Sequence, residues 1–169
     1  QMCRRHFGIG ADGLMELKSA PGYDFKMVYY NADGKEGSMC GNGGRCLVKF
    51  AHYVGIHKSE FKFTAIDGDH YASIEVNGWV RLKMKNVDGL ERSGNFDVLD
   101  TGSPHYVKSV TEIKAMDVVK EGKAIRYSEK FKEQGVNVNF VESISPTKLF
   151  VRTYERGVED ETFSCGTGV

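Results

Sequence analysis

Two cysteine-containing turns in this 169-residue chain have residue types suited to acid–base chemistry. Residues 40–43 (Cys-Gly-Asn-Gly) and 165–168 (Cys-Gly-Thr-Gly) share the pattern Cys-Gly-polar-Gly, and each follows an expected strand and a polar turn. The first turn of a helix has free backbone N–H groups and a partial positive charge, which lower the pKa of a thiol and can also hold a carboxylate. Glycines let the backbone approach a ligand closely. Each turn therefore predicts a proton-transfer thiol beside a carboxylate site.

Used together, the two thiols suit the inversion of an α-carbon. That reaction needs a base on one face of the carbon and an acid on the other, and a thiol/thiolate pair supplies both in either direction. Helix N-termini aimed at the substrate carboxylate would stabilise the carbanion-like transition state without pyridoxal phosphate or a metal. We predict that Cys40 and Cys165 form this pair.

The cysteines also allow other roles. A single Cys-Gly turn is weak evidence, because cysteines are common as small buried hydrophobes. Cys40 and Cys46 lack zinc-ligand spacing, and no His or Cys cluster lies beside Cys165, so no metal is expected. Cys46 is predicted to lie in the core, on the apolar face of a helix. A redox-sensing disulfide between Cys40 and Cys165 remains the alternative outside enzyme catalysis.

Bulk composition excludes several classes of protein. Lys plus Arg and Asp plus Glu number 23 each, so the basic excess typical of nucleic-acid and membrane-surface proteins is missing. No apolar stretch is long enough to span a bilayer, and no signal peptide is visible. Reduced thiols in the cytoplasm are the favoured reading of the four cysteines. The chain starts at Gln1 and ends after a turn that should lead into a helix, so a fragment is expected.

The elements that must position the turns are mainly strands. Residues 24–31 alternate as a strand does, and residues 31–34 (Asn-Ala-Asp-Gly) have turn chemistry. A helix should start near Asn42 or Gly43 and stop at Gly55, with helically spaced apolar residues: Cys46, Leu47, Phe50, Ala51 and Val54.

The rest of the chain predicts more strands and two short helices. Strands are expected at 61–65, 70–76, 79–84, 96–100, within 101–107, at 136–141 and at 149–154, and helices at 110–120 and 125–132. Asn77-Gly78 is a strong hairpin signal. The repeated cysteine pattern indicates two similar halves, 1–98 and 99–169.

The motifs together resemble those of the diaminopimelate epimerase family. Residues 31–34 and 39–46 (Met-Cys-Gly-Asn-Gly-Gly-Arg-Cys) resemble its first catalytic segment, and residues 154–157 (Tyr-Glu-Arg-Gly) and 164–168 resemble its second. Residues 8–13 and 102–105 also resemble family segments in the same order. The resemblance implies interconversion of LL- and meso-diaminopimelate, on the route to lysine and peptidoglycan precursors. It further implies two pseudo-symmetric α/β domains (α+β mixed sheets), each with mixed strands around a central helix and with the active site in the cleft between them. No cofactor, a cytoplasmic location and a homodimer are implied as well.

The resemblance also assigns roles by position. Cys40 and Cys165 would be the catalytic thiols. The other site residues would bind substrate. Those near the reacting carbon would be Gly41, Asn42, Gly43, His105, Glu155, Gly166 and Thr167. Those at the distal amino-acid group would be Asn31, Ser103, Asn137 and Arg156. A guanidinium such as that of Arg156 clamps a carboxylate with two parallel hydrogen bonds.

Some of these positions have plainer readings. His105 is also compatible with an ordinary turn histidine, Glu155-Arg156 with a solvated pair, and Asn31 with an Asx turn. The role assigned to Asn137 at the distal amino-acid group could equally belong to Asn139, which lies two residues away on the same strand face.

The chain also departs from the family pattern. The family usually has Asn where Ser103 stands, and many members carry a longer polar side chain where Gly13 stands. A proline or hydroxyproline racemase-type enzyme is the alternative isomerase. Phenazine-biosynthesis-type isomerases lack the cysteine pair, and Arg156 favours a substrate with a second charged end.

Overall fold

The computed structural model describes residues 1–168, which fold as two compact units. The first unit is Gln1–Lys85, and the second starts at Asn86. This division comes before the predicted boundary between residues 98 and 99, because the strand at Leu90–Arg92 pairs inside the second unit. Neither α-helix in residues 1–168 has the length and apolar character needed to cross a bilayer.

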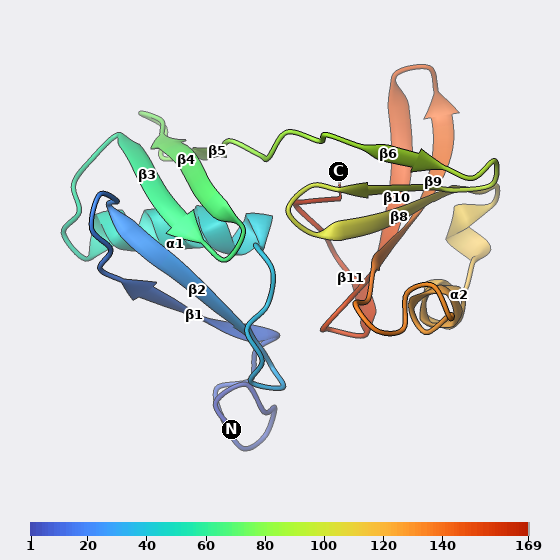
Figure 1. The fold of residues 1–169 in the computed structure, drawn as a ribbon, viewed down its shortest axis with the longest axis horizontal. Helices are drawn as coiled ribbons and strands as arrows, with labels where there is room; N and C mark the ends of the chain where they lie inside the picture. The colour runs from blue at the N-terminus through green and yellow to red at the C-terminus, as the bar shows by residue number, and fades with distance from the viewer. Residues whose placement is uncertain (169) are drawn as a thin grey trace. The chain divides into compact units, whose positions relative to one another are not determined.

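The first unit is a mixed sheet with one helix (Figure 1). Its strand order in the described residues is β1-β2-β3-β4-β5. Neighbouring strands are antiparallel except β2 and β3, which run parallel and are joined through the helix. The elements are β1 (Gly13–Lys18), β2 (Phe25–Asn31), α1 (Gly41–Tyr53), β3 (Glu60–Ala65), β4 (Gly68–Ile74) and β5 (Val80–Leu82). The predicted hairpin is confirmed, since β4 pairs with β5 and Gly78 adopts a positive φ.

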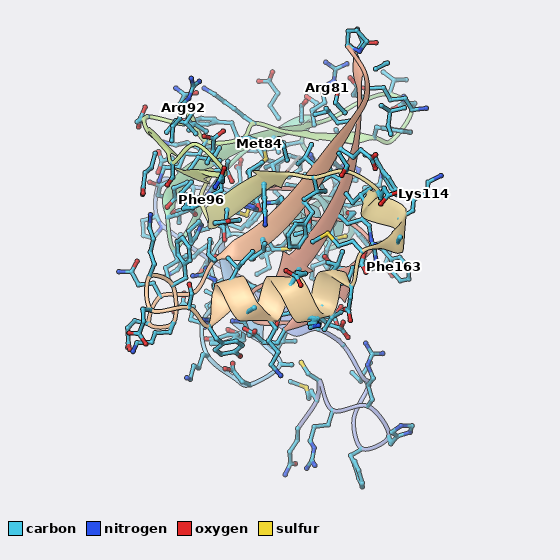
Figure 2. The ribbon with its side chains drawn as sticks, turned by 90° about the vertical axis from the view of Figure 1, so that its right-hand side faces the viewer. Arg81, Met84, Arg92, Phe96, Lys114 and Phe163 are labelled. Carbon is cyan, nitrogen blue, oxygen red and sulfur yellow. The ribbon has the colours of Figure 1, made fainter. Side chains whose placement is uncertain are left out.

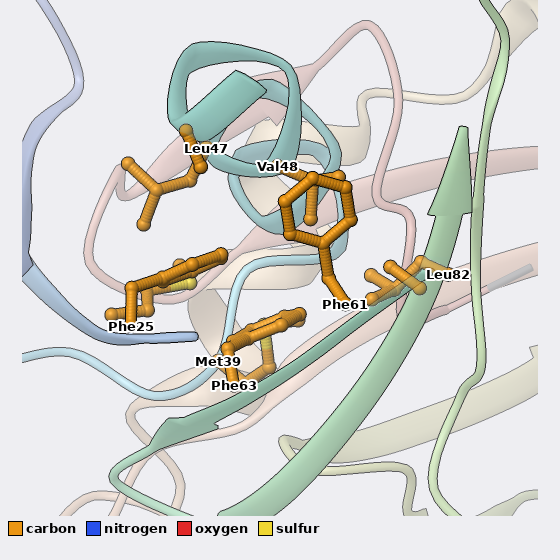
Figure 3. Packing of buried hydrophobic residues seen from close by; sticks show 10 residues of the cluster. Phe25, Met39, Leu47, Val48, Phe61, Phe63 and Leu82 are labelled. Carbon is orange, nitrogen blue, oxygen red and sulfur yellow. The ribbon is translucent and has the colours of Figure 1, made fainter. Parts of the chain in front are cut away.

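The core of the first unit lies between the sheet and α1 (Figure 3). Phe25 and Phe63 stack with ring centroids 4.7 Å apart, beneath the buried Leu47 and Val48 of the helix. The prediction that Cys46 belongs to this core is wrong, because its side chain is exposed. The buried face of α1 runs through Gly44, Leu47, Val48 and Ala51, and the apolar residues Cys46 and Phe50 lie on the opposite face.

The second unit is also a mixed sheet with helical segments. Its strand order in the described residues is β11-β10-β9-β8-β7-β6, and only β8 and β9 run parallel. The elements are β6 (Leu90–Arg92), β7 (Asp97–Asp100), β8 (Pro104–Ser109), the 3₁₀ turn η1 (Ile113–Ala115), α2 (Val118–Arg126), β9 (Asn137–Ser145), β10 (Lys148–Glu155) and β11 (Asp160–Thr162). As in the first unit, the parallel pair is joined through a helix.

Aromatic residues fill much of the second core. Phe96, labelled in Figure 2, stacks on Tyr106 with ring centroids 4.4 Å apart. Tyr106 also meets Phe131 edge-on at 5.9 Å. Phe140 and Tyr154 are fully buried on neighbouring strands. Val118 and Ile125 of α2 join the same cluster, which holds the helix against β9 and β10.

The helices predicted at 110–120 and 125–132 are wrong in their bounds. A single α-helix, α2, occupies the middle of that span. Its start is set by Asp117, whose side chain accepts a hydrogen bond from the N–H of Lys120 at 3.0 Å. Glu112 adopts a left-handed conformation with φ 54°, which prevents a helix from running through residue 112.

Gly122 gives a test of this packing. A Cβ on Gly122 would come within 2.4 Å of the Tyr154 Cβ, so the helix lies directly against β10. Helix propensity alone favours alanine over glycine, but overpacking here should dominate. We expect Gly122→Ala to lower the free energy of unfolding by about 1–3 kcal/mol in urea denaturation.

Gly89→Ala is the matched control. No atom lies within 4 Å of a Cβ built on Gly89, and its φ is not in the left-handed region, so its stability should change little. A Gly122→Ala protein that is more stable than the parent would contradict the close packing of α2 on Tyr154.

Candidate active site

Cys40 is the N-cap of α1, immediately before the helix, as predicted. Its backbone is extended (φ −106°, ψ 114°), and its Sγ accepts the N–H of Gly43 at 3.3 Å. Its carbonyl accepts the N–H of Gly44 at 2.7 Å. A Cβ on Gly43 would lie 2.5 Å from Met15 Sδ and 3.4 Å from the Cys40 sulfur. A side chain at position 43 would therefore have to displace Met15 and would press on Cys40, so glycine leaves room beside this thiol.

The neighbouring predicted residues surround the same helix start. Gly41 is buried and its carbonyl accepts a hydrogen bond from Arg45 Nη1 at 3.1 Å, whereas the Asn42 side chain is exposed. Asn31 ends β2, and its backbone closes the predicted turn by accepting the N–H of Gly34 at 2.9 Å.

Cys165 lies in a turn of similar chemistry in the second unit. It is buried, and the backbone N–H groups of Thr167 and Gly168 and the Thr167 hydroxyl, 3.5 Å away, stabilise its thiolate. Burial nevertheless raises the pKa of the Cys165 thiol, and the nearby Glu155 carboxylate raises it further. The direction is opposite to the lowered pKa predicted from the sequence, because desolvation outweighs the N–H donors.

His105 lies in strand β8, not in a turn. Its side chain is 1% exposed, and its Nε2 lies 3.0 Å from the Thr167 hydroxyl. Burial lowers the pKa of His105 to about 4, and the Arg156 charge contributes in the same direction, whereas Asp100 opposes it. The imidazole is therefore neutral at pH 7.

This buried neutral histidine predicts a pH-dependent stability. The folded pKa is about 4 and the ordinary value is 6.5, so the unfolded chain binds more protons between these values. The free energy of unfolding should fall as the pH is lowered from about 6.5 to about 4, by at most ~3 kcal/mol from this group. His105→Gln should flatten that part of the curve in urea denaturation at a series of pH values. An equally steep curve in the variant would contradict the assignment.

Asn137 and Ser103 form a buried pair. Asn137 Nδ2 donates to Ser103 Oγ at 3.0 Å, and its Oδ1 accepts the backbone N–H of Arg156 at 2.9 Å. Asn137 is the first residue of β9, so its amide links the residue before β8 with the residue after β10. His105 Nε2 lies 3.5 Å from the same amide nitrogen.

Arg156 follows β10 and is partly buried. Its Nη1 donates to the carbonyl of Gln134 at 2.8 Å. Burial lowers the pKa of the guanidinium, and the charge of Arg126 adds to this effect. A Cβ on Gly135, which has φ 75°, would lie 2.4 Å from Arg156 Cδ, so the Gly135 turn shapes the stem of Arg156.

Glu155 is the last residue of β10. Its Oε2 accepts the hydroxyl of Thr162 at 2.9 Å, across the β10–β11 pair. Its charge acts on the Cys165 thiol. Glu155 is therefore held at the same end of the sheet as the cysteine turn.

The structure thus groups the predicted residues within each unit. In the first unit Gly41, Asn42 and Gly43 follow Cys40, and Asn31 ends the preceding strand. In the second unit Ser103, His105, Asn137, Glu155, Arg156, Gly166 and Thr167 gather around Cys165. All four cysteines, Cys3 and Cys46 included, are free of disulfide bonds. In residues 1–168, no three His, Cys, Asp or Glu side chains are grouped as metal ligands.

Two residues of the buried network received no role from the sequence: Asn139, which was named only as a competitor of Asn137, and Thr153. Asn139 Nδ2 lies 2.9 Å from His105 Nδ1, and Asn139 Oδ1 accepts the Thr153 hydroxyl at 2.9 Å. Asn139 and Thr153 are opposite each other on β9 and β10. Polar residues at alternate positions of an otherwise apolar strand, Asn137 and Asn139, were the available signal.

Known structures define the fold class. The chain is similar to a phenazine biosynthesis protein of the PhzF family from Bacillus anthracis, with a TM-score of 0.68, 11% identity, and coverage of 93% of this chain and 62% of that one. It is also similar to a hydroxyproline epimerase from Agrobacterium vitis, with a TM-score of 0.61, 14% identity, and coverage of 86% and 54%. At these identities the likeness shows a shared fold of mixed sheets with helices.

Sequence comparison identifies the family. The diaminopimelate epimerase family model matches residues 1–88 and 98–169. The chain is 53% identical to a diaminopimelate epimerase of Flavobacterium psychrophilum over 99% of this chain and 66% of that protein. It is 46% identical to a diaminopimelate epimerase of Chlorobaculum tepidum, over 99% of this chain and 68% of that protein. The chain belongs to the diaminopimelate epimerase family, and it spans about two thirds of the length of these relatives.

Proposed function

We propose that this protein is a cofactor-independent epimerase that interconverts LL- and meso-diaminopimelate. Cys40 and Cys165 are the two proton-transfer groups, one for each face of the α-carbon. The observation that carries the proposal is the shared geometry of the two turns. In each, backbone N–H groups just after the cysteine favour its thiolate: the Gly43 N–H donates to Cys40 Sγ at 3.3 Å, and the N–H groups of Thr167 and Gly168 lower the pKa of Cys165.

The chemistry follows from these donors. One thiolate removes the α-proton while the other thiol delivers a proton to the opposite face, so the reverse reaction uses the same groups with their roles exchanged. Backbone N–H groups at each turn also bind the α-carboxylate, where negative charge develops in the transition state. Burial of Cys165 favours its protonated form in the resting enzyme.

The other predicted residues would read the rest of the substrate. Arg156 would clamp the distal carboxylate, with Asn31 and Asn137 at the distal amino-acid group and His105 and Glu155 near the reacting amine. Asn137 and Ser103 hydrogen-bond each other, so we propose that they act as a preorganised pair. On the same basis we propose a cytoplasmic location and a homodimeric state.

A substrate comparison tests the proposed function. The purified protein under reducing conditions is offered LL-diaminopimelate, proline and hydroxyproline, and inversion is followed by chiral chromatography. We expect inversion of diaminopimelate alone. Turnover of proline alone would overturn the substrate assignment. Absence of all turnover in a fully reduced enzyme would favour the thiol redox switch.

A further inference from the structure

A buried line of three polar side chains, those of Asn139, His105 and Thr167, leads from strand β9 to the sulfur of Cys165. Asn139 Nδ2 lies 2.9 Å from His105 Nδ1, and His105 Nε2 lies 3.0 Å from Thr167 Oγ1. Thr167 Oγ1 in turn lies 3.5 Å from Cys165 Sγ. Each of these residues is at most 7% exposed. All belong to the second unit, so the line depends on one rigid sheet and one turn.

The orientation of the Asn139 amide is fixed by its other neighbours. Asn139 Nδ2 lies 3.3 Å from the carbonyl oxygen of Tyr106, which can only accept a hydrogen bond. On the other side, Asn139 Oδ1 accepts the hydroxyl of Thr153 at 2.9 Å. The amide therefore presents N–H to His105, and His105 Nδ1 must accept.

That acceptance determines which nitrogen of His105 carries the proton. A neutral imidazole has one N–H and one bare nitrogen. With Nδ1 accepting from Asn139 at 2.9 Å, the proton lies on Nε2, which donates to Thr167 Oγ1 at 3.0 Å. The amide nitrogen of Asn137 is farther from Nε2, at 3.5 Å, and donates instead to Ser103 Oγ at 3.0 Å. The hydroxyl proton of Thr167 is then turned away from His105, and the Cys165 sulfur is the acceptor on the other side.

We propose that Asn139 is a positioning residue for Cys165. By holding His105 as the Nε2–H tautomer, it directs the Thr167 hydroxyl proton to the Cys165 sulfur, where the hydrogen bond stabilises the thiolate. The role in turnover rests on the proposed epimerase function, but the proton arrangement does not. The network counteracts the burial of Cys165, because a hydrogen bond to a charged group is stronger than one to a neutral group.

The backbone of the cysteine turn supports this arrangement independently. A Cβ on Gly168 would lie 2.6 Å from Asn139 Oδ1 and 2.9 Å from His105 Cε1. The turn therefore rests directly on the Asn139–His105 pair, with only glycine allowing the approach. Thr101 Oγ1 also donates to the Thr167 carbonyl at 2.7 Å, which holds Thr167 in register.

Two NMR measurements test the proposal without requiring turnover. Histidine ¹⁵N shifts report which nitrogen of His105 is protonated, and cysteine ¹³Cβ shifts followed over pH report the thiolate fraction at Cys165. In the parent protein we expect His105 to be protonated on Nε2. Thr167→Val should lower the Cys165 thiolate fraction about tenfold at a pH below the titration midpoint, whereas Thr167→Ser, which keeps the hydroxyl, should restore it.

Asn139→Leu tests the first link of the line. It should weaken the preference of His105 for the Nε2–H tautomer and lower the thiolate fraction of Cys165. Thr153→Val is the matched control, because it removes a hydroxyl bonded to the same Asn139 while the Tyr106 carbonyl still orients the amide. We expect both readouts to stay at parent values in Thr153→Val.

Two outcomes would overturn the proposal. One is a parent protein whose His105 is protonated on Nδ1, a result that does not depend on any variant folding. The other is a folded Thr167→Val protein with an unchanged Cys165 titration. Exchange of the substrate α-proton in the same samples separates the two hypotheses, since a parent protein with the expected shifts and no exchange would contradict only the epimerase function.

Discussion

Replacing either Cys40 or Cys165 with serine is expected to lower the rate of diaminopimelate epimerisation by about 10³-fold or more. A serine hydroxyl is a far weaker acid than a thiol, so it neither removes the α-proton as an anion nor returns one efficiently. The loss should appear mainly in kcat, because the substitution leaves in place the backbone N–H groups of both turns, which we propose hold the carboxylate.

Cys46→Ser provides the matched control for the first of these variants. Cys46 lies on α1, the helix that Cys40 caps, but its side chain is exposed on the face opposite the core. Its replacement should leave the rate near that of the parent. Steady-state kinetics under reducing conditions measure all three variants, and a Cys40→Ser or Cys165→Ser enzyme with a near-normal rate would contradict the two-thiol chemistry.

Arg156→Ala is expected to raise KM for diaminopimelate about 100-fold, with a smaller change in kcat. The guanidinium is partly buried, and its Nη1 is directed to the Gln134 carbonyl, so its stem is already ordered before substrate binds. Binding a distal carboxylate would relieve the cost of burying this charge, and its loss therefore weakens substrate binding more than chemistry.

Arg156→Lys separates charge from geometry. A lysine keeps the positive charge but cannot make two parallel hydrogen bonds to a carboxylate, so KM should lie between the parent and alanine values. An unchanged KM in Arg156→Ala would show that the distal end of the substrate is read elsewhere.

The parts of the site that could be predicted from sequence are those fixed by local residue order. Cys40 at the N-cap, the turn at residues 31–34 and the hairpin at Asn77-Gly78 depend on neighbouring residues, and the structure confirms each. The same is true of the strands predicted at 61–65 and 149–154, which correspond to β3 and β10. Local chemistry of this kind is decided by glycines, caps and turn residues.

The missed features depend on contacts distant in sequence. Whether the Cys165 thiol is easier or harder to ionise depends on its burial, which no turn motif reports. Asn139 reaches His105 because β8 and β9 pair in parallel, across a connection that contains α2. The exposed position of Cys46 was missed because the apolar residues of α1 occupy two faces, and only packing decides which is buried.

The bounds of α2 illustrate a different error. Asp117 is a strong capping residue, and Lys123 and Arg126 suit a helix C-terminus, so the local signals for residues 118–126 were present. Gly122 inside the helix obscured them, since glycine usually lowers helix propensity. Its presence is explained by the close contact with Tyr154, which is visible only in the folded chain.

The most direct test of the central claim follows the α-proton of diaminopimelate in deuterated water. Two thiols acting from opposite faces predict that the inverted product carries solvent deuterium from its first appearance, while unreacted substrate keeps its original proton at early times. The delivering thiol exchanges with solvent, whereas the abstracted proton goes to the other sulfur. Early product that carries the substrate's own α-proton would contradict the account, because a single base would then have moved that proton from one face to the other.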